Sequence, residues 1–180
     1  MVTLMSRTTR TRHSISIGVV SVYKDIASAT KIHVMRYELT TLMNGAEICK
    51  HLFHDAMTEA GMPGRSFAFQ ETIYRALDAG ESFGVIAFDG EEVAGFVSVF
   101  ISVATHFDGV VGSNDVLYVA PKYRNTLVPG RLMIFAEREA KRRGAIAFDW
   151  AANNKTSLDD SLSKRPDVYR LSQKHYLKEL

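Results

Sequence analysis

The segment from Asp115 to Gly144 constrains the fold more than any other part of the chain. It reads DVLYVAPKYRNTLVPGRLMIFAEREAKRRG. An apolar run ends at Ala-Pro, a polar loop follows, and apolar residues then recur at helical spacing until a glycine. A second apolar run occupies 146–151. Since a strand–helix–strand unit in one sheet is nearly always a right-handed parallel crossover, we expect the strands at 116–119 and 146–151 to be parallel neighbours.

The preceding residues predict helices followed by a hairpin. A strand is expected at 32–39. A helix then begins at Asn44, with Glu47 in the capping position, and ends at Gly61. Ser66 caps a second helix that ends at Gly80. Strands at 83–88 and 93–103 flank the turn dipeptide Asp89-Gly90.

After the crossover, the pattern predicts a short closing region. The crossover helix begins near Pro129, and the strand at 146–151 is expected to be buried. A short helix spans 157–164, and the runs at 168–171 and 176–180 are candidate closing strands. The expected fold is therefore a single α/β domain over 31–180, preceded by an arm or extra strand at 1–30.

Composition narrows the class of protein. The chain has 180 residues, of which 46% are hydrophobic and 23% charged, which excludes a disordered chain. Its single cysteine, Cys49, allows no intramolecular disulfide and fits a reducing cytoplasm. The net charge of +2 (22 basic minus 20 acidic residues) argues against nucleic acid as a partner, and no apolar run is long enough to span a membrane.

The N-terminal arm has two further interpretations. Arg7, Arg10 and Arg12 precede the apolar stretch 15–23, which weakly resembles a secretory signal, but serines interrupt the stretch and Lys24 follows it. The same arginines make a nucleic-acid contact the third-ranked hypothesis. A surface strand or loosely held arm is the favoured interpretation.

The loop before the crossover helix is a candidate anion site. Unpaired N–H groups at a helix start bind phosphate oxygens. Arg124 and Arg131 add positive charge on either side of this start.

This segment resembles the acetyl-CoA motif of the GNAT family of N-acetyltransferases. The resemblance lies in Leu-Tyr-Val-x-Pro-x-Tyr-Arg, in Leu-Met-x-Phe-Ala-Glu, in the Lys-Arg-Arg-Gly helix end and in the strand end Asp-Trp-Ala-Ala-Asn-Asn. It covers about 31–180. It implies a mixed, mostly antiparallel central sheet flanked by helices, with a parallel strand pair at the cofactor site.

The resemblance also implies how acetyl-CoA would bind. Its pantetheine arm would pair with the strand edge at Leu117, Tyr118 and Val119. Asn154 would contact the cofactor after the fifth strand. The pyrophosphate would lie on the helix-start loop, formed by Arg124, Asn125, Thr126, Leu127, Val128, Gly130 and Arg131.

This loop departs from the family pattern. Leu127 and Pro129 stand where glycines are usual, and Gly130 comes one residue late. Glycine allows the backbone to approach a pyrophosphate closely, so Leu127 is expected to narrow the cradle. Pro129 suits the first helical turn but lacks an N–H donor.

Candidate catalytic residues follow from the same resemblance. Asp115, expected at the start of its strand, is the first choice for the base that takes the amine proton through water, ahead of Asp149 and His106. The helix after the fifth strand lacks the family's tyrosine. The general acid is therefore Ser161 or Tyr169, with Ser163 or bulk water as alternatives.

The function expected from these residues is acyl-CoA-dependent transfer of an acetyl group to a primary amine. The acceptor is not identified, although carboxylates on the early helices, such as Asp55, Glu59 and Glu71, are candidate contacts for a cation. The alternative is a non-catalytic CoA-binding or protein-interaction module. No metal is expected, since His51 and His54 have no further clustered ligand. A homodimer is left open.

Overall fold

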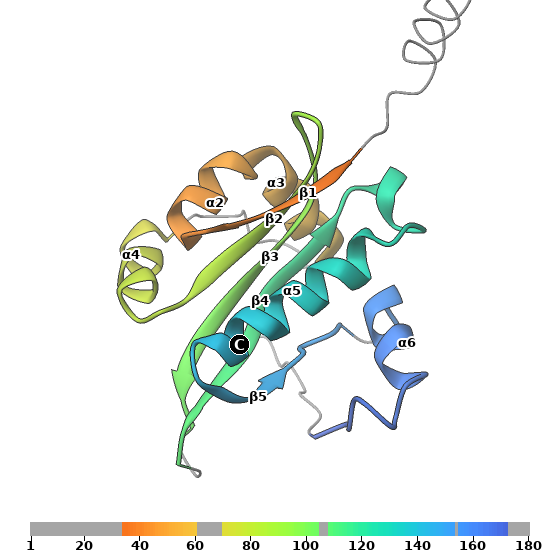
Figure 1. Ribbon diagram of the computed structural model, residues 1–180. Coiled ribbons are helices and arrows are strands. Elements are labelled where there is room, and N and C mark those ends of the chain that lie inside the picture. Colours follow the sequence, from red (N-terminus) through yellow and green to blue (C-terminus); the bar gives the residue numbers. More distant parts are fainter. Residues whose placement is uncertain (1–33, 61–69, 105–107, 154, 173–180) are drawn as a thin grey trace, which may run out of the picture. The chain divides into compact units, whose positions relative to one another are not determined.

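The computed structural model describes residues 34–60, 70–104, 108–153 and 155–172 (Figure 1). The arm predicted for 1–30 lies outside these residues, so the division of the chain into an arm and a domain stays a prediction. None of the described helices is long and apolar enough to cross a membrane.

A five-stranded sheet forms the centre of the fold, with the strands in chain order across it. Its first three neighbouring pairs are antiparallel and the last is parallel. This arrangement confirms both the mostly antiparallel sheet and the parallel crossover. The strands are β1 (Met35–Thr40), β2 (Phe83–Asp89), β3 (Glu92–Val103), β4 (Val110–Val119) and β5 (Ala145–Asp149).

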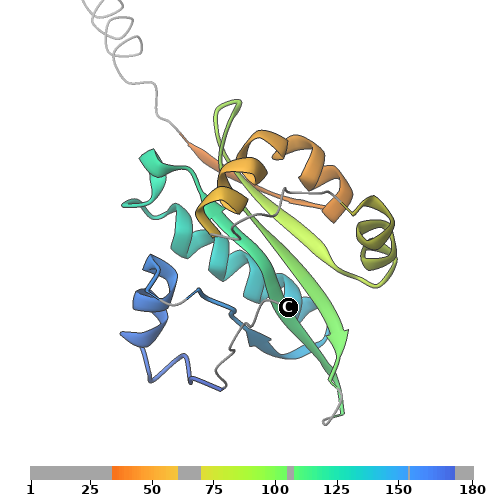
Figure 2. The same cartoon turned by 180° about the vertical axis from the view of Figure 1, so that it is seen from behind.

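Helices cover both faces of the sheet. The crossover helix α5 (Val128–Arg142) lies on one face, and α2 (Leu42–Ile48) and α3 (Lys50–Ala60) lie on the other (Figures 1 and 2). The remaining elements are α4 (Glu71–Ala79), the short 3-10 helix η1 (Pro121–Tyr123) and α6 (Ser157–Ser163).

Each helical layer has its own core. Leu132 and Ala136 of α5 are fully buried against the sheet together with Val97 and Val99 of β3. Phe53 of α3 belongs to a second cluster on the opposite face of the sheet. The strand residues of this cluster alternate along the chain with the strand residues of the first cluster. The second cluster contains Ala46, Cys49, Leu52, Phe53, Ala56, Ile86, Phe88, Val93, Phe96 and Tyr118. Two independent apolar layers thus fix the central strands on both sides.

The start of the first helix differs from the prediction. Thr41, not Asn44, caps α2, and its side chain accepts a hydrogen bond from the Asn44 N–H. Asp78 of α4 accepts from the N–H groups of Leu42 and Met43, at 2.6 and 3.1 Å. A carboxylate from another helix thus satisfies the helix start, so the predicted capping box with Glu47 is wrong.

The fourth strand is longer than predicted. It begins at Val110 because it pairs with β3 from Val103 onward, over a stretch whose Gly-Ser-Asn composition does not predict a strand. Asp115 therefore lies inside β4 and not at its start, which corrects the prediction.

Two expectations for the end of the chain are wrong. β5 is the edge strand of the described sheet, and Ile146 is 61% exposed, so the expectation of a buried strand is wrong. Val168 to Leu171 form no strand. Instead, the N–H groups of Val168 and Tyr169 close a turn onto the Arg165 carbonyl. The predicted strand at 176–180 lies outside the described residues.

Candidate active site

The parallel strands β4 and β5 separate halfway along β4. Their pairing runs from Val110 and Ala145 to Ser113 and Asp149. Beyond Ser113, β4 continues to Val119 and pairs only with β3 among the described residues. The second half of β4 therefore has an open edge at the position where the sequence predicts the acyl-CoA site.

The Asn114 side chain bridges the strands at the point of separation. Its amide nitrogen donates to the Ala151 carbonyl at 3.1 Å, and its amide oxygen accepts from the Ala151 N–H at 2.7 Å. Asn114 is buried, at 7% exposure. A side chain thus takes the place of the next backbone ladder rung, and the two backbones are held farther apart than in a sheet.

The open edge presents backbone groups of β4. In an antiparallel pair, alternate residues bond to the neighbouring strand and the others point away from it. The Ala120 N–H donates to Ala94 of β3. The backbone N–H and C=O groups of Leu117 and Val119 therefore point away from β3. The Val119 carbonyl is already used, because it accepts from Arg124 Nε at 2.9 Å. Leu117 therefore offers a backbone donor and acceptor to an added strand.

Asp115 occupies a β-bulge beside this edge. Ser98 of β3 pairs with Val116 and Val99 pairs with Asn114, so Asp115 has no partner in β3. The Ser98 hydroxyl accepts from the Val116 N–H at 3.1 Å and donates to Asp115 Oδ2 at 3.2 Å. The bulge thus turns the carboxylate toward the face covered by α2 and α3.

Tyr74 of α4 is a second contact of Asp115. Its hydroxyl donates to Asp115 Oδ2 at 3.0 Å. Burial raises the pKa of Asp115, and the hydrogen bonds from Tyr74 and Ser98 lower it by less. Burial and the nearby Asp115 carboxylate also raise the pKa of Tyr74, which therefore remains a donor at neutral pH. Sequence reasoning missed Tyr74, because no local signal connects it with residue 115.

Arg124 directly follows η1 in the loop after β4 and contacts three groups. Besides the Val119 carbonyl, it bonds both carboxylate oxygens of Glu59 in α3, at 2.7 and 2.9 Å. The guanidinium carbon lies 5.4 Å from the centre of the Tyr118 ring. The Tyr118 hydroxyl donates to the same Glu59 carboxylate, at 3.3 Å. Arg124 thus links the loop to α3.

The helix-start loop keeps only part of its predicted donors. The N–H groups of Thr126, Val128 and Arg131 bond to neighbouring atoms of the same loop, and Pro129 has none. The N–H groups of Asn125, Leu127 and Gly130 have no protein partner among the described residues. They are the loop's remaining candidate donors to a phosphate.

The replacement of a family glycine by Leu127 is tolerated locally. Leu127 adopts ordinary right-handed helical angles (φ −77°, ψ −5°), so its backbone does not require glycine. Its side chain is 71% exposed and contributes little to the core. At Gly130, an added Cβ would meet nothing within 4 Å. The backbone in front of α5 is therefore accessible.

The hydroxyls of the two candidate general acids, Ser161 and Tyr169, bond to residues other than Asp115. The Ser161 hydroxyl donates to the Ser157 carbonyl within α6, at 2.6 Å. The Tyr169 hydroxyl donates to Glu137 of α5 at 3.0 Å, and the Trp150 indole donates to the same carboxylate oxygen. Burial, followed by the bond to Glu137, raises the pKa of Tyr169.

Other candidate residues have different outcomes. Asn154 and His106 lie outside the described residues, and Asp149 is exposed at the end of β5. Glu59 and Glu71 are in ion pairs with Arg124 and Arg75, so these two carboxylates are not open cation contacts. No group of three or more metal-ligating side chains occurs in the described part of the chain.

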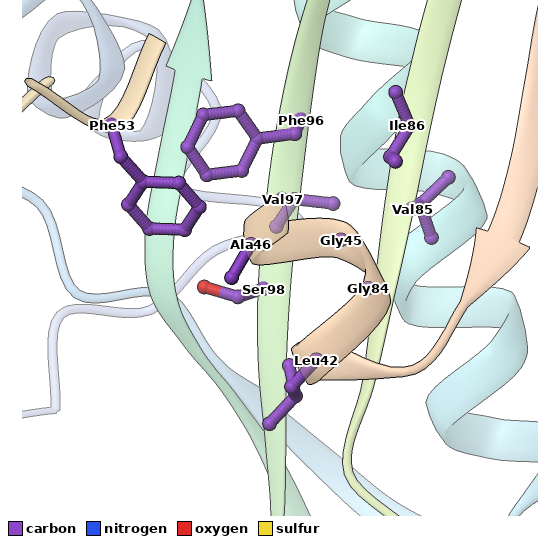
Figure 3. Close-up of a pocket in the computed structure, with 10 residues that line it drawn as sticks. All are labelled: Leu42, Gly45, Ala46, Phe53, Gly84, Val85, Ile86, Phe96, Val97 and Ser98. Carbon is purple, nitrogen blue, oxygen red and sulfur yellow. The ribbon is translucent and has the colours of Figure 1, made fainter. Parts of the chain in front are cut away.

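A small apolar hollow lies beneath α2 on the same sheet face. Its volume is about 10 Å³, which is room for no more than one water. Figure 3 shows its lining from α2, α3, β2 and β3, with Ser98 as a polar member. It is too small for an acyl-CoA, so the open edge of β4 is the better candidate. The nearby Cys49 is fully buried, and burial raises its thiol pKa to about 12, so it is not a nucleophile.

Comparison with known proteins agrees with this geometry. Residues 47–159 match the acetyltransferase (GNAT) family model. The sheet, the crossover and the separation of β4 from β5 define an acetyltransferase fold, and the chain belongs to the GNAT family. A comparison with curated protein sequences gives no significant match.

Solved structures share the fold at low sequence identity. An aminoglycoside acetyltransferase from an uncultured soil metagenomic sample, in complex with sisomicin, is similar with a TM-score of 0.64 and 13% identity, over 81% of this chain and 96% of that one. Aminoglycoside N-acetyltransferase AAC(6')-Iy in complex with CoA gives 0.61 and 12%, over 84% and 99%. A ribosomal-protein-alanine N-acetyltransferase from Brucella melitensis biovar Abortus 2308 gives 0.59 and 13%, over 82% and 100%.

Proposed function

We propose that the protein transfers an acetyl group from acetyl-CoA to a primary amine by direct attack of the amine on the thioester. The observation that carries this proposal is the open edge of β4, with Asp115 in a bulge two residues before Leu117. This arrangement supplies backbone pairing for one substrate and a carboxylate for the other.

The chain has residues that suit acetyl-CoA. The backbone groups of Leu117 would pair with the pantetheine amides as an added strand does. The accessible N–H groups of Leu127 and Gly130 would receive phosphate oxygens at the start of α5, where the helix dipole favours negative charge. Arg131, which is exposed, and Arg124 add positive charge to the same loop.

Asp115 is the proposed general base. An alkylamine has a pKa near 10.4 and is mostly protonated at neutral pH, so a proton must leave before attack. Asp115 takes this proton through a water molecule. The amine nitrogen then bonds to the carbonyl carbon, the carbon–sulfur bond breaks, and the nitrogen releases its second proton to solvent, which leaves a neutral amide and a CoA thiolate. The Leu117 N–H stabilises the charge that develops on the carbonyl oxygen.

Solvent is the proposed source of the last proton. The hydroxyls of Ser161 and Tyr169 donate to protein oxygens on α6 and α5. A CoA thiolate is a stable leaving group and takes its proton from water without a dedicated acid. We propose a cytoplasmic location for this chemistry, supported by the single, buried and unpaired Cys49.

A non-catalytic CoA-binding module is the alternative function. Pro129 and the internally bonded amides of the loop favour it, because they reduce the number of phosphate donors. Calorimetric titration with acetyl-CoA and with CoA tests binding first. Release of free thiol in the presence of an amine panel then tests transfer. The panel contains aminoglycosides, polyamines, lysine peptides and alanine-terminated peptides.

The two tests separate the two functions. Binding with acceptor-dependent thiol release supports the acetyltransferase. Binding without release from any amine supports the module. If neither acetyl-CoA nor CoA binds, both proposals fail.

A further inference from the structure

We infer that Tyr74 is a positioning residue, which holds the Asp115 carboxylate in the orientation that transfer requires. This inference rests on the proposed function of Asp115 as the base. Tyr74 lies 41 positions before Asp115, on a different element, and their contact is a direct hydrogen bond of 3.0 Å.

The placement of α4 supports this role. None of its residues is buried, so apolar packing does little to hold the helix. Instead, Asp78 bonds two N–H groups at the start of α2, and Tyr74, one turn earlier, bonds Asp115. Both residues lie on the same side of α4 because they are four positions apart. The helix is thus held by polar contacts, and one of them reaches the proposed base.

The hydrogen bonds divide the two carboxylate oxygens of Asp115. Tyr74 and Ser98 both donate to Oδ2, and no described residue donates to Oδ1. Two donors from different elements prevent the carboxylate from rotating freely. Oδ1 therefore remains in a defined direction as the acceptor for the water that carries the amine proton.

Removing the Tyr74 hydroxyl should shift the pKa of Asp115 in a predictable direction. The described groups that face Asp115 are Tyr74 from α4 and Ser98 from β3, and both bonds favour the charged carboxylate. Losing one of them raises the pKa of Asp115. The active carboxylate then forms at higher pH, and the acidic limb of the pH–rate profile moves upward.

The test compares the full-length wild type with Tyr74→Phe, which keeps the ring and loses the donor. We expect kcat/KM to fall about 10-fold, the loss expected for one hydrogen bond to a charged group. The affinity for acetyl-CoA should stay unchanged. The carboxyl carbon of Asp115, followed by NMR during a pH titration, should titrate at higher pH, and this readout requires no acceptor.

Tyr37→Phe is the matched control. The Tyr37 hydroxyl is buried, has no hydrogen-bond partner among the described residues and belongs to β1, so its removal should change neither readout. If Asp115 titrates in Tyr74→Phe as in the wild type, or if kcat/KM stays within twofold, the inference is overturned. Asp115→Asn separates this result from a failure of the proposed function. If Asp115→Asn is fully active, Asp115 is not the base and the proposed function of this residue fails. If Asp115→Asn is inactive while Tyr74→Phe is fully active, only the positioning role of Tyr74 fails.

Discussion

The Asn114 side-chain amide bonds both backbone groups of Ala151, at 3.1 and 2.7 Å, where the ladder between β4 and β5 ends. The two residues are 37 positions apart and belong to different arms of the crossover. A side chain with its hydrogen bonds spans a longer distance than a direct backbone hydrogen bond. This contact therefore sets a wider separation of the two strands. It thereby leaves the second half of β4 open.

Replacement of Asn114 tests this separation. Asn114→Ala removes two hydrogen bonds from a buried position and leaves the backbone groups of Ala151 without their partners. We expect a loss of about 1–3 kcal/mol in the free energy of unfolding. Weaker acetyl-CoA binding, measured by calorimetry on the folded protein, should accompany it. Asn44→Ala, which removes an exposed amide from α2, is the control. Unchanged affinity in Asn114→Ala would contradict a role in shaping the site.

Replacement of Asp115 separates a catalytic role from a structural one. Asp115→Asn should lower kcat/KM by about 10²–10⁴ when chemistry is limiting, and the acidic limb should disappear. Acetyl-CoA affinity should not change, because the carboxylate is turned toward the sheet face covered by α2 and α3 and not along the open edge of β4. Wild-type rates across the amine panel would contradict the assignment.

Asp115→Asn should also change the stability of the folded protein in a predictable direction. The pKa of Asp115 is raised in the folded protein, so its ionisation opposes folding. Any stability that the neutral form provides is therefore lost as pH rises through the folded-state pKa. A neutral amide at this position avoids this cost, and the melting temperature of Asp115→Asn at neutral pH should equal or exceed that of the wild type. A clearly lower melting temperature would indicate a structural carboxylate.

Arg124 and Glu59 form a pair for testing the phosphate contact. Arg124→Glu should weaken acetyl-CoA binding, because it replaces a cation beside the phosphates with an anion. Glu59→Gln should retain binding, since it keeps a hydrogen-bond acceptor and leaves the arginine. The ion pair itself is partly exposed, at 38% and 50%, and should contribute no more than about 1 kcal/mol to stability. Equal affinity of the wild type and Arg124→Glu, by calorimetry, would remove Arg124 from the site.

Leu127→Gly tests the narrowed cradle. If the side chain restricts the approach of the pyrophosphate, this change should tighten CoA binding a few-fold. It should not destabilise the protein, because Leu127 is exposed and glycine is preferred over leucine at a helix N-cap. Leu127→Ala is the control for side-chain size. Unaltered affinity in a folded Leu127→Gly would show that the cradle is not narrowed.

The elements that local patterns encode were predicted well. The α5 helix, with its apolar face and C-terminal glycine, follows from periodicity within a short window, and so does the β2–β3 hairpin from its turn chemistry. The turn itself is one residue later than expected, at Gly90 and Glu91, because Asp89 pairs with Glu92. The crossover rule then supplied the parallel pairing of β4 and β5. The residues of the family motif lie in the same windows, so the sequence alone also determined the fold class.

Features that depend on distant partners were decided by the tertiary structure. β4 begins at Val110 because β3 extends beside it, and Asp78 determines the start of α2 from another helix. The carboxylate of Asp115 meets the Ser98 hydroxyl when β3 and β4 pair, and it meets the Tyr74 hydroxyl only when α4 is placed beside them. Periodicity reports which face of an element is apolar, but it carries no information on which polar side chains meet across elements. The acetyltransferase fold was therefore readable from the chain, whereas the surroundings of its proposed base were not.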